Sequence, residues 1–255
     1  MFIYFGVLVV VCGLVPHDDL YSLAEVYEAM FSWDPETEAE YLDNVFHSFC
    51  SVKCKRVLDV GCGTGRVAEG LARLGYSVLG LDVCREMCVY ARRVRGLDVV
   101  AGDGGLLPFR DCCFDGVYSM LATFNHFDSE EKLFIHLREV CRILRRGGVY
   151  VADSVVESPG RVGVCEEWST AWRGRECRVR WVVESVEDRY YTEILELVCG
   201  GSTVFRSRAV LYAPSREEVF ELSKRAGFSS VVLLEPFSFK EKRGVGRAFM
   251  VFLKK

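Results

Sequence analysis

One short segment of the chain constrains its fold more than any other. The stretch RVLDVGCGTGR, from Arg56 to Arg66, places three glycines directly after a short β-branched run. Because glycine lacks a Cβ atom, such a turn can bend sharply and bring backbone close to a ligand. In an open α/β sheet, ligands bind at the carboxyl ends of the strands. The segment therefore predicts an α/β sheet with a ligand site at the end of its first strand.

The pattern that follows this turn alternates between strand-like and helix-like periodicity. Strands alternating with helices indicate a parallel sheet covered by helices on both faces. The sequence therefore predicts a doubly wound, Rossmann-like α/β fold. We expect strands at 57–60, 77–82, 97–101, 114–121 and 149–152, and helices at 67–74, 85–95 and 129–145.

The periodicity changes after the fifth strand. Three long alternating segments, 176–186, 190–198 and 203–211, are joined by Glu187-Asp188 and Gly200-Gly201, which are typical of hairpin turns. This predicts an antiparallel β insertion after the fifth strand, before a helix and two closing strands. The expected organisation is an apolar segment at 1–20, a helical cap at 21–50, the main domain at 51–154 and 213–255, and an antiparallel lid at 155–212.

The first fifteen residues, MFIYFGVLVVVCGLV, are apolar. They lack the basic start and the cleavage site of a signal peptide. As a helix they would be about 22 Å long, which is short of a bilayer core of about 30 Å. Three interpretations stay open: a mis-assigned start codon, a segment packed on the domain, or a weak membrane anchor. We expect no stable membrane insertion.

The amino-acid composition limits the kinds of partner that the protein can bind and indicates the environment in which it works. A net charge of -4 argues against wholesale binding of nucleic acid, which needs a basic footprint. The chain has no Gln and only two Asn, and such depletion of amides marks proteins that work hot. Because hyperthermophiles also form intracellular disulfides, the twelve cysteines suit a cytoplasmic, thermophilic protein with structural disulfides. Short-loop candidates are Cys50 with Cys54, and the vicinal Cys112 and Cys113 with partners elsewhere; no zinc pattern is complete.

Carboxylates at the strand ends narrow the choice of ligand. A dinucleotide fingerprint would need glycine at position 66, where this chain has Arg66, and no P-loop is present. Asp82 ends the second strand, where a ribose diol can donate to one carboxylate. Asp103 ends the third strand and can accept from an adenine amine, and Asp59 can face a cation. Ribose, adenine and a positive charge favour S-adenosylmethionine over a dinucleotide.

The motifs resemble those of the class I S-adenosylmethionine-dependent methyltransferases. LDVGCGTG resembles their first motif, Gly80-Leu81-Asp82 the acidic second, and Gly102-Asp103-Gly104 the adenine-contacting third. FDGVYSMLATFNHF and LREVCRILRRGGVYVAD are similar to the fourth strand and to the helix and fifth strand of that family. The similarity covers roughly Val52 to Asp153. The insertion resembles the lid of small-molecule methyltransferases, including the glycine and sarcosine type, although it carries no matching motif.

The resemblance implies roles for particular residues. His126 follows the fourth strand, where it could act as a base, orient the substrate or be structural, and Asn125 could contact substrate. Met87 could pack against the adenosine or be an ordinary core residue. An aromatic residue of the cap could face the sulfonium through cation–π attraction, or it could anchor the cap to the domain. Four residues near the lid could line a pocket, although packing is the default explanation for them: Glu167, Trp168, Trp172 and Tyr191. The implied cofactor contacts are Asp59, Gly61, Cys62, Gly63, Asp82, Val83, Met87, Asp103, Gly104, Leu121, Tyr27 and Trp33.

The expected function is methyl transfer from S-adenosylmethionine to N or O of a small molecule. Such a reaction chiefly needs the acceptor, methyl group and sulfur to be aligned with water excluded. The alternatives are an RNA or protein methyltransferase, and a non-catalytic cofactor-binding protein. Neither a metal nor nucleic acid is an expected partner, and a homodimer is compatible with the sequence.

Overall fold

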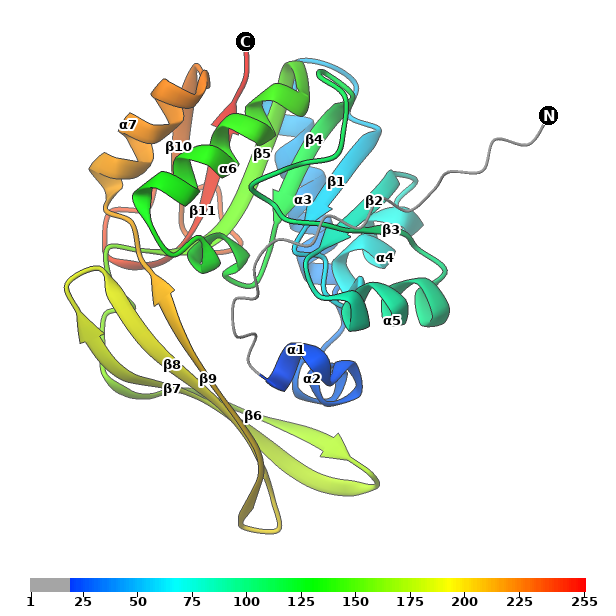
Figure 1. Cartoon of the computed structure of the whole chain (residues 1–255), viewed down its shortest axis with the longest axis vertical. Helices are drawn as coiled ribbons and strands as arrows, with labels where there is room; N and C mark the ends of the chain where they lie inside the picture. The colour runs from blue at the N-terminus through cyan, green and yellow to red at the C-terminus, as the bar shows by residue number, and fades with distance from the viewer. Residues whose placement is uncertain (1–18) are drawn as a thin grey trace.

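The computed structural model describes residues 19–255, and its centre is a seven-stranded sheet (Figure 1). The strand order is β10-β11-β5-β4-β1-β2-β3, and only β11 runs antiparallel to its neighbours. The predicted Rossmann-like sheet is confirmed. Its strands are β1 (Arg56–Val60), β2 (Ser77–Asp82), β3 (Asp98–Ala101), β4 (Phe114–Ser119), β5 (Leu144–Val156), β10 (Ser230–Leu234) and β11 (Gly246–Leu253).

Helices cover both faces of this sheet, and each face has its own hydrophobic core. On one face, α6 and α7 pack together over apolar side chains of β1, β4, β5 and β11. Helix α7 begins with a capping box of Ser215 and Glu218, which satisfies free backbone N–H groups. On the other face lie α3 and α4. The helices are α3 (Glu36–Phe49), α4 (Arg66–Arg73), α5 (Arg85–Arg95), α6 (Glu130–Ile143) and α7 (Arg216–Ala226), with a 3-10 turn η1 (Thr123–His126) after β4.

The predicted helical cap is smaller than residues 21–50. Leu42, Val45 and Phe46 of α3 are fully buried against the main sheet, so α3 belongs to the core of the main domain. Only α1 (Asp19–Ser22) and α2 (Ala24–Met30) stand apart as a cap. The apolar segment 1–15 lies outside the described residues. No helix among residues 19–255 combines the length and the apolar character needed to cross a membrane.

The insertion forms a separate antiparallel sheet in the order β6-β7-β8-β9. The predicted turn at Gly200-Gly201 is present, with φ angles of 60° and 81° that glycine adopts readily. The first strand was not predicted, because β6 lies at the sheet edge and carries polar residues that break its alternation. The four strands are β6 (Gly163–Trp172), β7 (Arg175–Glu187), β8 (Tyr190–Cys199) and β9 (Ser202–Tyr212).

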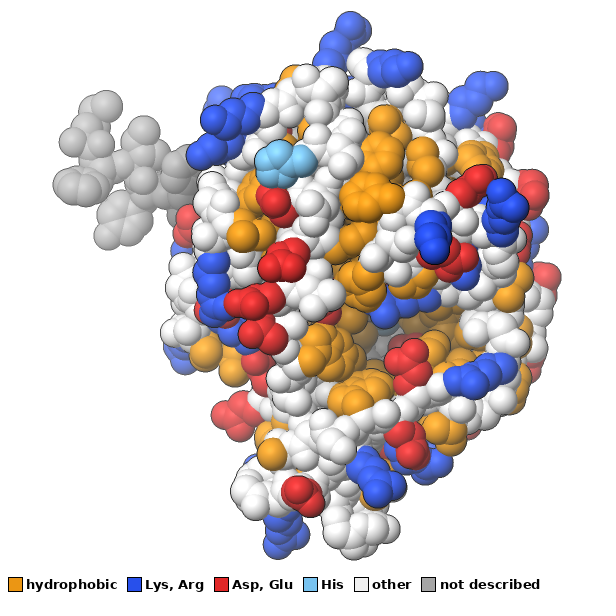
Figure 2. All heavy atoms as spheres, turned by 180° about the vertical axis from the view of Figure 1, so that it is seen from behind, with side chains coloured by type: hydrophobic (Ala, Val, Ile, Leu, Met, Phe, Trp, Pro, Cys, Tyr) orange, Lys and Arg blue, Asp and Glu red, His pale blue; other side chains and the backbone are white. Residues whose placement is uncertain are grey.

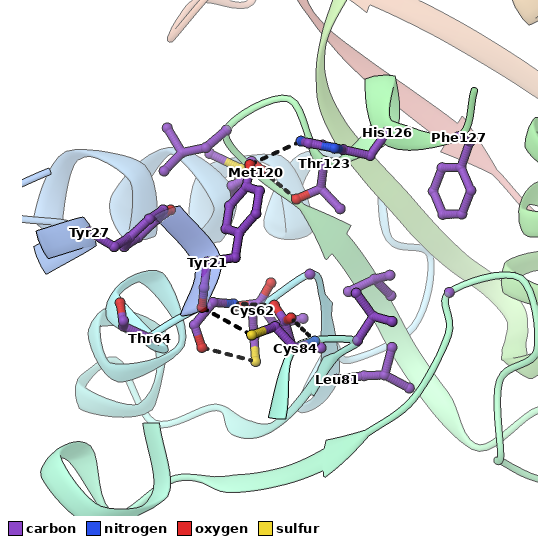
Figure 3. Close-up of a pocket in the computed structure, with 18 of the residues that line it drawn as sticks. Tyr21, Tyr27, Cys62, Thr64, Leu81, Cys84, Met120, Thr123, His126 and Phe127 are labelled. Atoms are coloured by element: carbon purple, nitrogen blue, oxygen red, sulfur yellow. Dashed lines mark hydrogen bonds between the residues drawn. The ribbon is translucent and has the colours of Figure 1, made fainter. Parts of the chain in front are cut away.

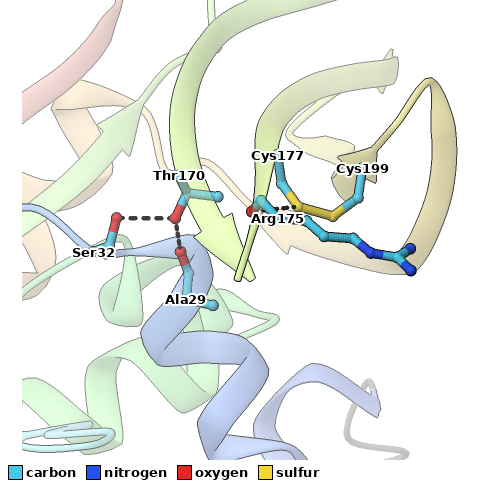
Figure 4. The surroundings of a disulfide bond; sticks show 6 residues. All are labelled: Ala29, Ser32, Thr170, Arg175, Cys177 and Cys199. Atoms are coloured by element: carbon cyan, nitrogen blue, oxygen red, sulfur yellow. Dashed lines mark hydrogen bonds between the residues drawn. A yellow bond between two sulfur atoms is a disulfide. The ribbon is translucent and has the colours of Figure 1, made fainter. Parts of the chain in front are cut away.

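A disulfide joins the lid strands where the lid meets the cap (Figure 4). Cys177 and Cys199 lie directly opposite each other on β7 and β8, with their Cα atoms 4.3 Å apart. They share a hydrophobic cluster with Leu20 and Met30 of the cap. The predicted pairing was wrong: Cys50, Cys54, Cys112 and Cys113 are free thiols.

Polar contacts also connect the lid to the cap. The Trp168 indole of β6 donates to the carbonyl oxygen of Met30 over 2.6 Å. The Thr170 hydroxyl donates to the carbonyl oxygen of Ala29 and lies 3.0 Å from the Ser32 hydroxyl oxygen (Figure 4). The lid therefore positions α1 and α2 relative to the main sheet.

Candidate active site

A cavity of about 720 Å³ opens at the carboxyl ends of the parallel strands. This volume falls within the range of roughly 300–1,000 Å³ typical of ligand pockets. The cap contributes Tyr21 and Tyr27 to its wall (Figure 3). Strand β9 of the lid contributes Arg208, Ala209 and Val210. Seen from behind, apolar side chains border a hollow above the lid (Figure 2). The cavity is thus bounded by all three parts of the described chain.

The glycine turn after β1 forms one wall of the cavity. Gly61 has a φ of 73°, and a Cβ atom there would lie 2.3 Å from the Thr123 methyl carbon. Glycine is therefore required for this turn to fit against η1. The backbone N–H of Gly63 donates to the Asp82 carboxylate over 2.7 Å. The turn after β1 and the acid at the end of β2 consequently hold each other in place.

Two acids lie at the carboxyl ends of β2 and β3: Asp82 is the last residue of β2, and Asp103 follows β3. Both oxygens of the nearly buried Asp82 accept backbone hydrogen bonds, since its Oδ1 accepts from the Cys84 N–H over 2.8 Å. Asp103 is exposed, and its Oδ1 accepts from the Gly105 N–H over 2.7 Å. Both side chains line the cavity with the half-exposed Val83. The wall therefore combines two positioned carboxylates with apolar surface.

Asp59 is a third acid, and it lies deeper. Burial raises the pKa of its carboxyl to about 8, the Asp82 carboxylate adds to this rise, and the Tyr118 hydroxyl partly offsets it. A lone buried carboxyl thus favours its neutral form at pH 7. A cation placed beside it would favour the ionised form instead. The position is suited to a positively charged ligand group.

Four residues on the cap side of the cavity complete the wall, and three of them were absent from the predicted site. Tyr27 lies over the glycine turn, because a Cβ atom at Gly63 would be 3.8 Å from its ring. Arg66 donates to the Trp33 carbonyl oxygen and stacks over the Trp33 ring. Among the described residues, the buried Glu38 Oε2 and Thr64 Oγ1 have no hydrogen-bond partner. Unpartnered polar atoms on a cavity wall favour a polar ligand.

Several predicted contacts lie elsewhere. Met87 is a fully buried residue of α5 and does not line the cavity. Trp33 is not in the wall either: its ring packs between Arg66 and Trp168, and its N–H donates to Glu38 over 2.7 Å. Sequence spacing could place both near the site but could not show which way their side chains point. The remaining predicted cofactor contacts line the cavity: Tyr27, Asp59, Gly61, Cys62, Gly63, Asp82, Val83, Asp103, Gly104 and Leu121.

Asn125 and His126 follow β4 but point to different places. Asn125 is fully buried, and its side-chain N–H groups donate to the carbonyl oxygens of Val155 and Tyr212 over 2.8 and 2.7 Å. Its Oδ1 accepts from the Val155 N–H and from the Ser154 hydroxyl. The expected substrate contact is corrected: Asn125 ties η1 to the two strands that connect the lid. His126 lines the cavity, and a hydrogen bond of 3.1 Å joins its Nε2 to the Tyr21 hydroxyl.

A substitution tests whether Asn125 stabilises the fold or contacts a ligand. We expect Asn125→Ala to lower the free energy of unfolding by about 2 kcal/mol, because it leaves buried backbone groups unpaired. The affinity for a cofactor should stay within about twofold, since no polar atom of this side chain is free to reach the cavity. Urea unfolding and calorimetry measure the two quantities. Unchanged stability with lost affinity would show that Asn125 acts in the site.

The lid residues considered from the sequence do not line the cavity. Trp168 and Trp172 pack against the cap, and Glu167 pairs with Arg180. Tyr191 of β8 is buried in the hydrophobic cluster that joins the lid strands to Val155 of β5. Packing therefore accounts for Trp168, Trp172 and Tyr191. The lid side of the cavity is formed by β9, whose residues carry no motif that could be recognised in the sequence.

Comparison with known proteins identifies this arrangement. Residues 58–152 match a family model described as a methyltransferase domain. These residues thus form a methyltransferase domain. It is 36% identical over 137 residues to a malonyl-[acyl-carrier protein] O-methyltransferase from Pectobacterium atrosepticum. This match covers 52% of the chain and 51% of the relative, so the chain spans about half the length of that curated protein.

Solved structures share the fold over most of the chain. The S-adenosylmethionine-bound amino pentose methyltransferase CalS10 from Micromonospora echinaspora superposes with a TM-score of 0.76 at 22% identity, covering 90% of this chain and 97% of that one. The sugar N-methyltransferase KedS8 from Streptoalloteichus superposes with a TM-score of 0.72 at 18% identity, covering 100% and 99%. At these identities the likeness concerns the fold, including the region of the lid.

Proposed function

We propose that this protein transfers a methyl group from S-adenosylmethionine to N or O of a small molecule. One observation carries the proposal. The cavity that joins the glycine turn to Asp59, Asp82 and Asp103 is covered by the cap and by β9 of the lid. The cofactor is supported by this wall and by the bound S-adenosylmethionine named for CalS10.

The residues present suit the chemical groups of S-adenosylmethionine. Asp82 would accept hydrogen bonds from the ribose hydroxyls, since the backbone N–H groups of Gly63 and Cys84 hold its carboxylate in the cavity wall. Asp103 would accept from the adenine amine beside Val83. The charged end would meet Asp59, Arg66 and the unpartnered oxygens of Glu38 and Thr64. The assignment thus gives partners to buried polar atoms that otherwise have none.

The cofactor supplies a methyl group already activated on a sulfonium, so the protein chiefly positions the reactants and excludes water. Tyr27 covers the glycine turn, and its ring could face the sulfonium. Tyr21 and His126 join the cap to η1. An amine acceptor must be neutral to attack, whereas a hydroxyl needs a base to take its proton. His126 is our candidate for holding the acceptor or taking that proton.

The size of the acceptor follows from the walls of the cavity. Arg208, Ala209 and Val210 of β9 lie on one side, and the cap lies on another. The Tyr190 hydroxyl donates to the Asp128 carbonyl oxygen over 3.1 Å and fastens the lid beside η1. A folded RNA or protein would have to displace these elements. The arrangement therefore favours a small acceptor over a macromolecule.

Calorimetry tests the choice of cofactor. We expect S-adenosylmethionine and S-adenosylhomocysteine to bind with heats that fit one site per chain. Nicotinamide dinucleotides should give no heat, because position 66 carries Arg66 in place of the third glycine. Binding of a dinucleotide without S-adenosylhomocysteine would overturn the cofactor assignment.

A second prediction concerns how the affinity for S-adenosylmethionine depends on pH through Asp59. Its pKa of about 8 in the free protein means that a proton must leave before the carboxylate can pair with a cationic ligand. We expect affinity for S-adenosylmethionine to rise with pH by up to about tenfold per unit until pH 8, and then to level off. Asp59→Asn should remove this dependence. A dissociation constant that is flat from pH 6 to 8 in the unaltered protein would contradict the role.

A further inference from the structure

Two free thiols lie together at the end of the sheet opposite to the cavity, where the parallel strands begin. Cys50 follows the last residue of α3, and Cys54 lies two residues before β1. The Cys50 sulfur is 3.8 Å from the carbonyl oxygen of Asp115. A Cβ atom built on the next residue, Gly116, would lie 3.0 Å from the Cys54 sulfur. The two sulfurs therefore lie over adjacent residues of β4.

Small reagents can reach this pair. Cys50 and Cys54 are half-buried and line a second cavity of about 280 Å³, together with His47, Lys53 and Lys55. The cavity also contains one acid, Asp43, so the two lysines leave its lining with a positive balance that favours an anionic reagent. Most other free thiols of the described chain are closed off, since Cys62, Cys84, Cys88, Cys141 and Cys165 are buried.

The two thiols are not equivalent. A hydrogen bond from Cys54 lowers the pKa of Cys50, against the opposing effects of burial and the Asp115 carboxylate. The same hydrogen bond, with burial, raises the pKa of Cys54. Because the thiolate is the nucleophile in thiol chemistry, this difference favours Cys50 as the attacking group and Cys54 as the resolving one.

We propose that Cys50 and Cys54 form a redox-active dithiol that exchanges with low-molecular-weight anionic disulfides. The Cys50 thiolate attacks one sulfur of the small disulfide, forms a mixed disulfide and releases one small thiolate. Cys54 then loses its proton and attacks the Cys50 sulfur, which closes the Cys50–Cys54 bond and releases the second thiolate. The dithiol is oxidised by two electrons and the small disulfide is reduced to two thiols. The reaction is independent of the proposed methyl transfer, since it uses neither the cavity nor a cofactor.

Glutathione disulfide is the probe for this exchange. The full chain is incubated with it, blocked at acid pH, digested without reduction and mapped by mass spectrometry. We expect a linked Cys50–Cys54 peptide that disappears with dithiothreitol. Absence of this peptide while the exposed Cys112 becomes glutathionylated would overturn the proposal. Cys112→Ser serves as the matched control and should form the linked peptide as the unaltered protein does.

Single variants test the order of attack. Cys54→Ser should accumulate glutathione on Cys50, because the resolving thiol is gone. Cys50→Ser should leave Cys54 at least about tenfold less modified over the same time, since its thiol stays protonated. If the melting temperature of a serine variant falls, the alanine variant at the same position, Cys50→Ala or Cys54→Ala, is used in its place. Equal modification of the two positions would contradict the assigned roles.

Discussion

Asp82→Ala should weaken binding of S-adenosylmethionine by roughly 100-fold, or about 3 kcal/mol. The loss has two sources. The carboxylate that would accept from the ribose is removed, and the N–H groups of Gly63 and Cys84 lose their acceptor. The glycine turn would then no longer be held in the shape that approaches the ligand. Isothermal titration calorimetry measures the effect.

The matched control for this variant is Asp98→Ala. Asp98 is an exposed acid at the first position of β3, the end of the strand away from the cavity. Its loss removes the same charge but no contact with the wall, so the affinity should stay within about twofold. Equal affinity of the Asp82 variant and the unaltered protein would show that Asp82 does not hold the cofactor.

The second large effect concerns the lid. The double variant Cys177→Ser, Cys199→Ser should be less stable by about 3 kcal/mol, because the 22-residue loop is no longer closed in the unfolded chain. For a chain of this size we expect a fall in melting temperature of roughly 6–12 °C. The disulfide also lies in the cluster with Leu20 and Met30, so the cap should loosen along with the lid. Thermal unfolding followed by circular dichroism measures the shift.

Two comparisons test whether this shift comes from the disulfide. Cys112→Ser removes an exposed free thiol and should leave the melting temperature within about 1 °C. Adding a reductant to the unaltered protein should reproduce most of the fall seen in the double variant. If melting is the same with and without reductant and all thiols titrate as free, the disulfide is absent in solution.

Local sequence patterns predict most of the main domain. Each β-α unit has its own periodicity, and the parallel topology then places the ends of β1, β2 and β3 at one edge. For this reason the sequence alone predicts that Asp59, Asp82 and Asp103 share a site. The cavity lining contains all three. The expectations of a hot environment and a cytoplasmic location stay predictions.

The pairing of the disulfide could not be predicted from local sequence patterns. Glu187 pairs with Tyr190 at the end of the β7–β8 hairpin, and an unbroken register would set Cys177 opposite Gly200. A bulge between Val183 and Ser185 shifts the register by one residue, which places Cys177 opposite Cys199. No residue type in this stretch predicts the bulge. The pairing therefore depends on a feature of the folded sheet.

Parts of the site were missed for a similar reason. Glu38 and Arg66 reach the cavity because α3 and α4 pack side by side beneath the cap. In the sequence, Glu38 is one of several acids at the start of a helix, and Arg66 only argued against a dinucleotide. The contribution of β9 also depends on how the lid folds back over the sheet. These are long-range contacts, which periodicity does not encode.

The central claim is methyl transfer to a small molecule, and one measurement tests it most directly. The protein is incubated with S-adenosylmethionine labelled in its methyl group and a fractionated cell extract, with the Asp82→Ala variant as control. We predict label in the low-mass fraction, lost in the control. Label in RNA or protein would contradict the small-molecule assignment and identify the lid as a docking surface for a macromolecule. Absence of transfer to any fraction, despite cofactor binding, would contradict the enzymatic role itself.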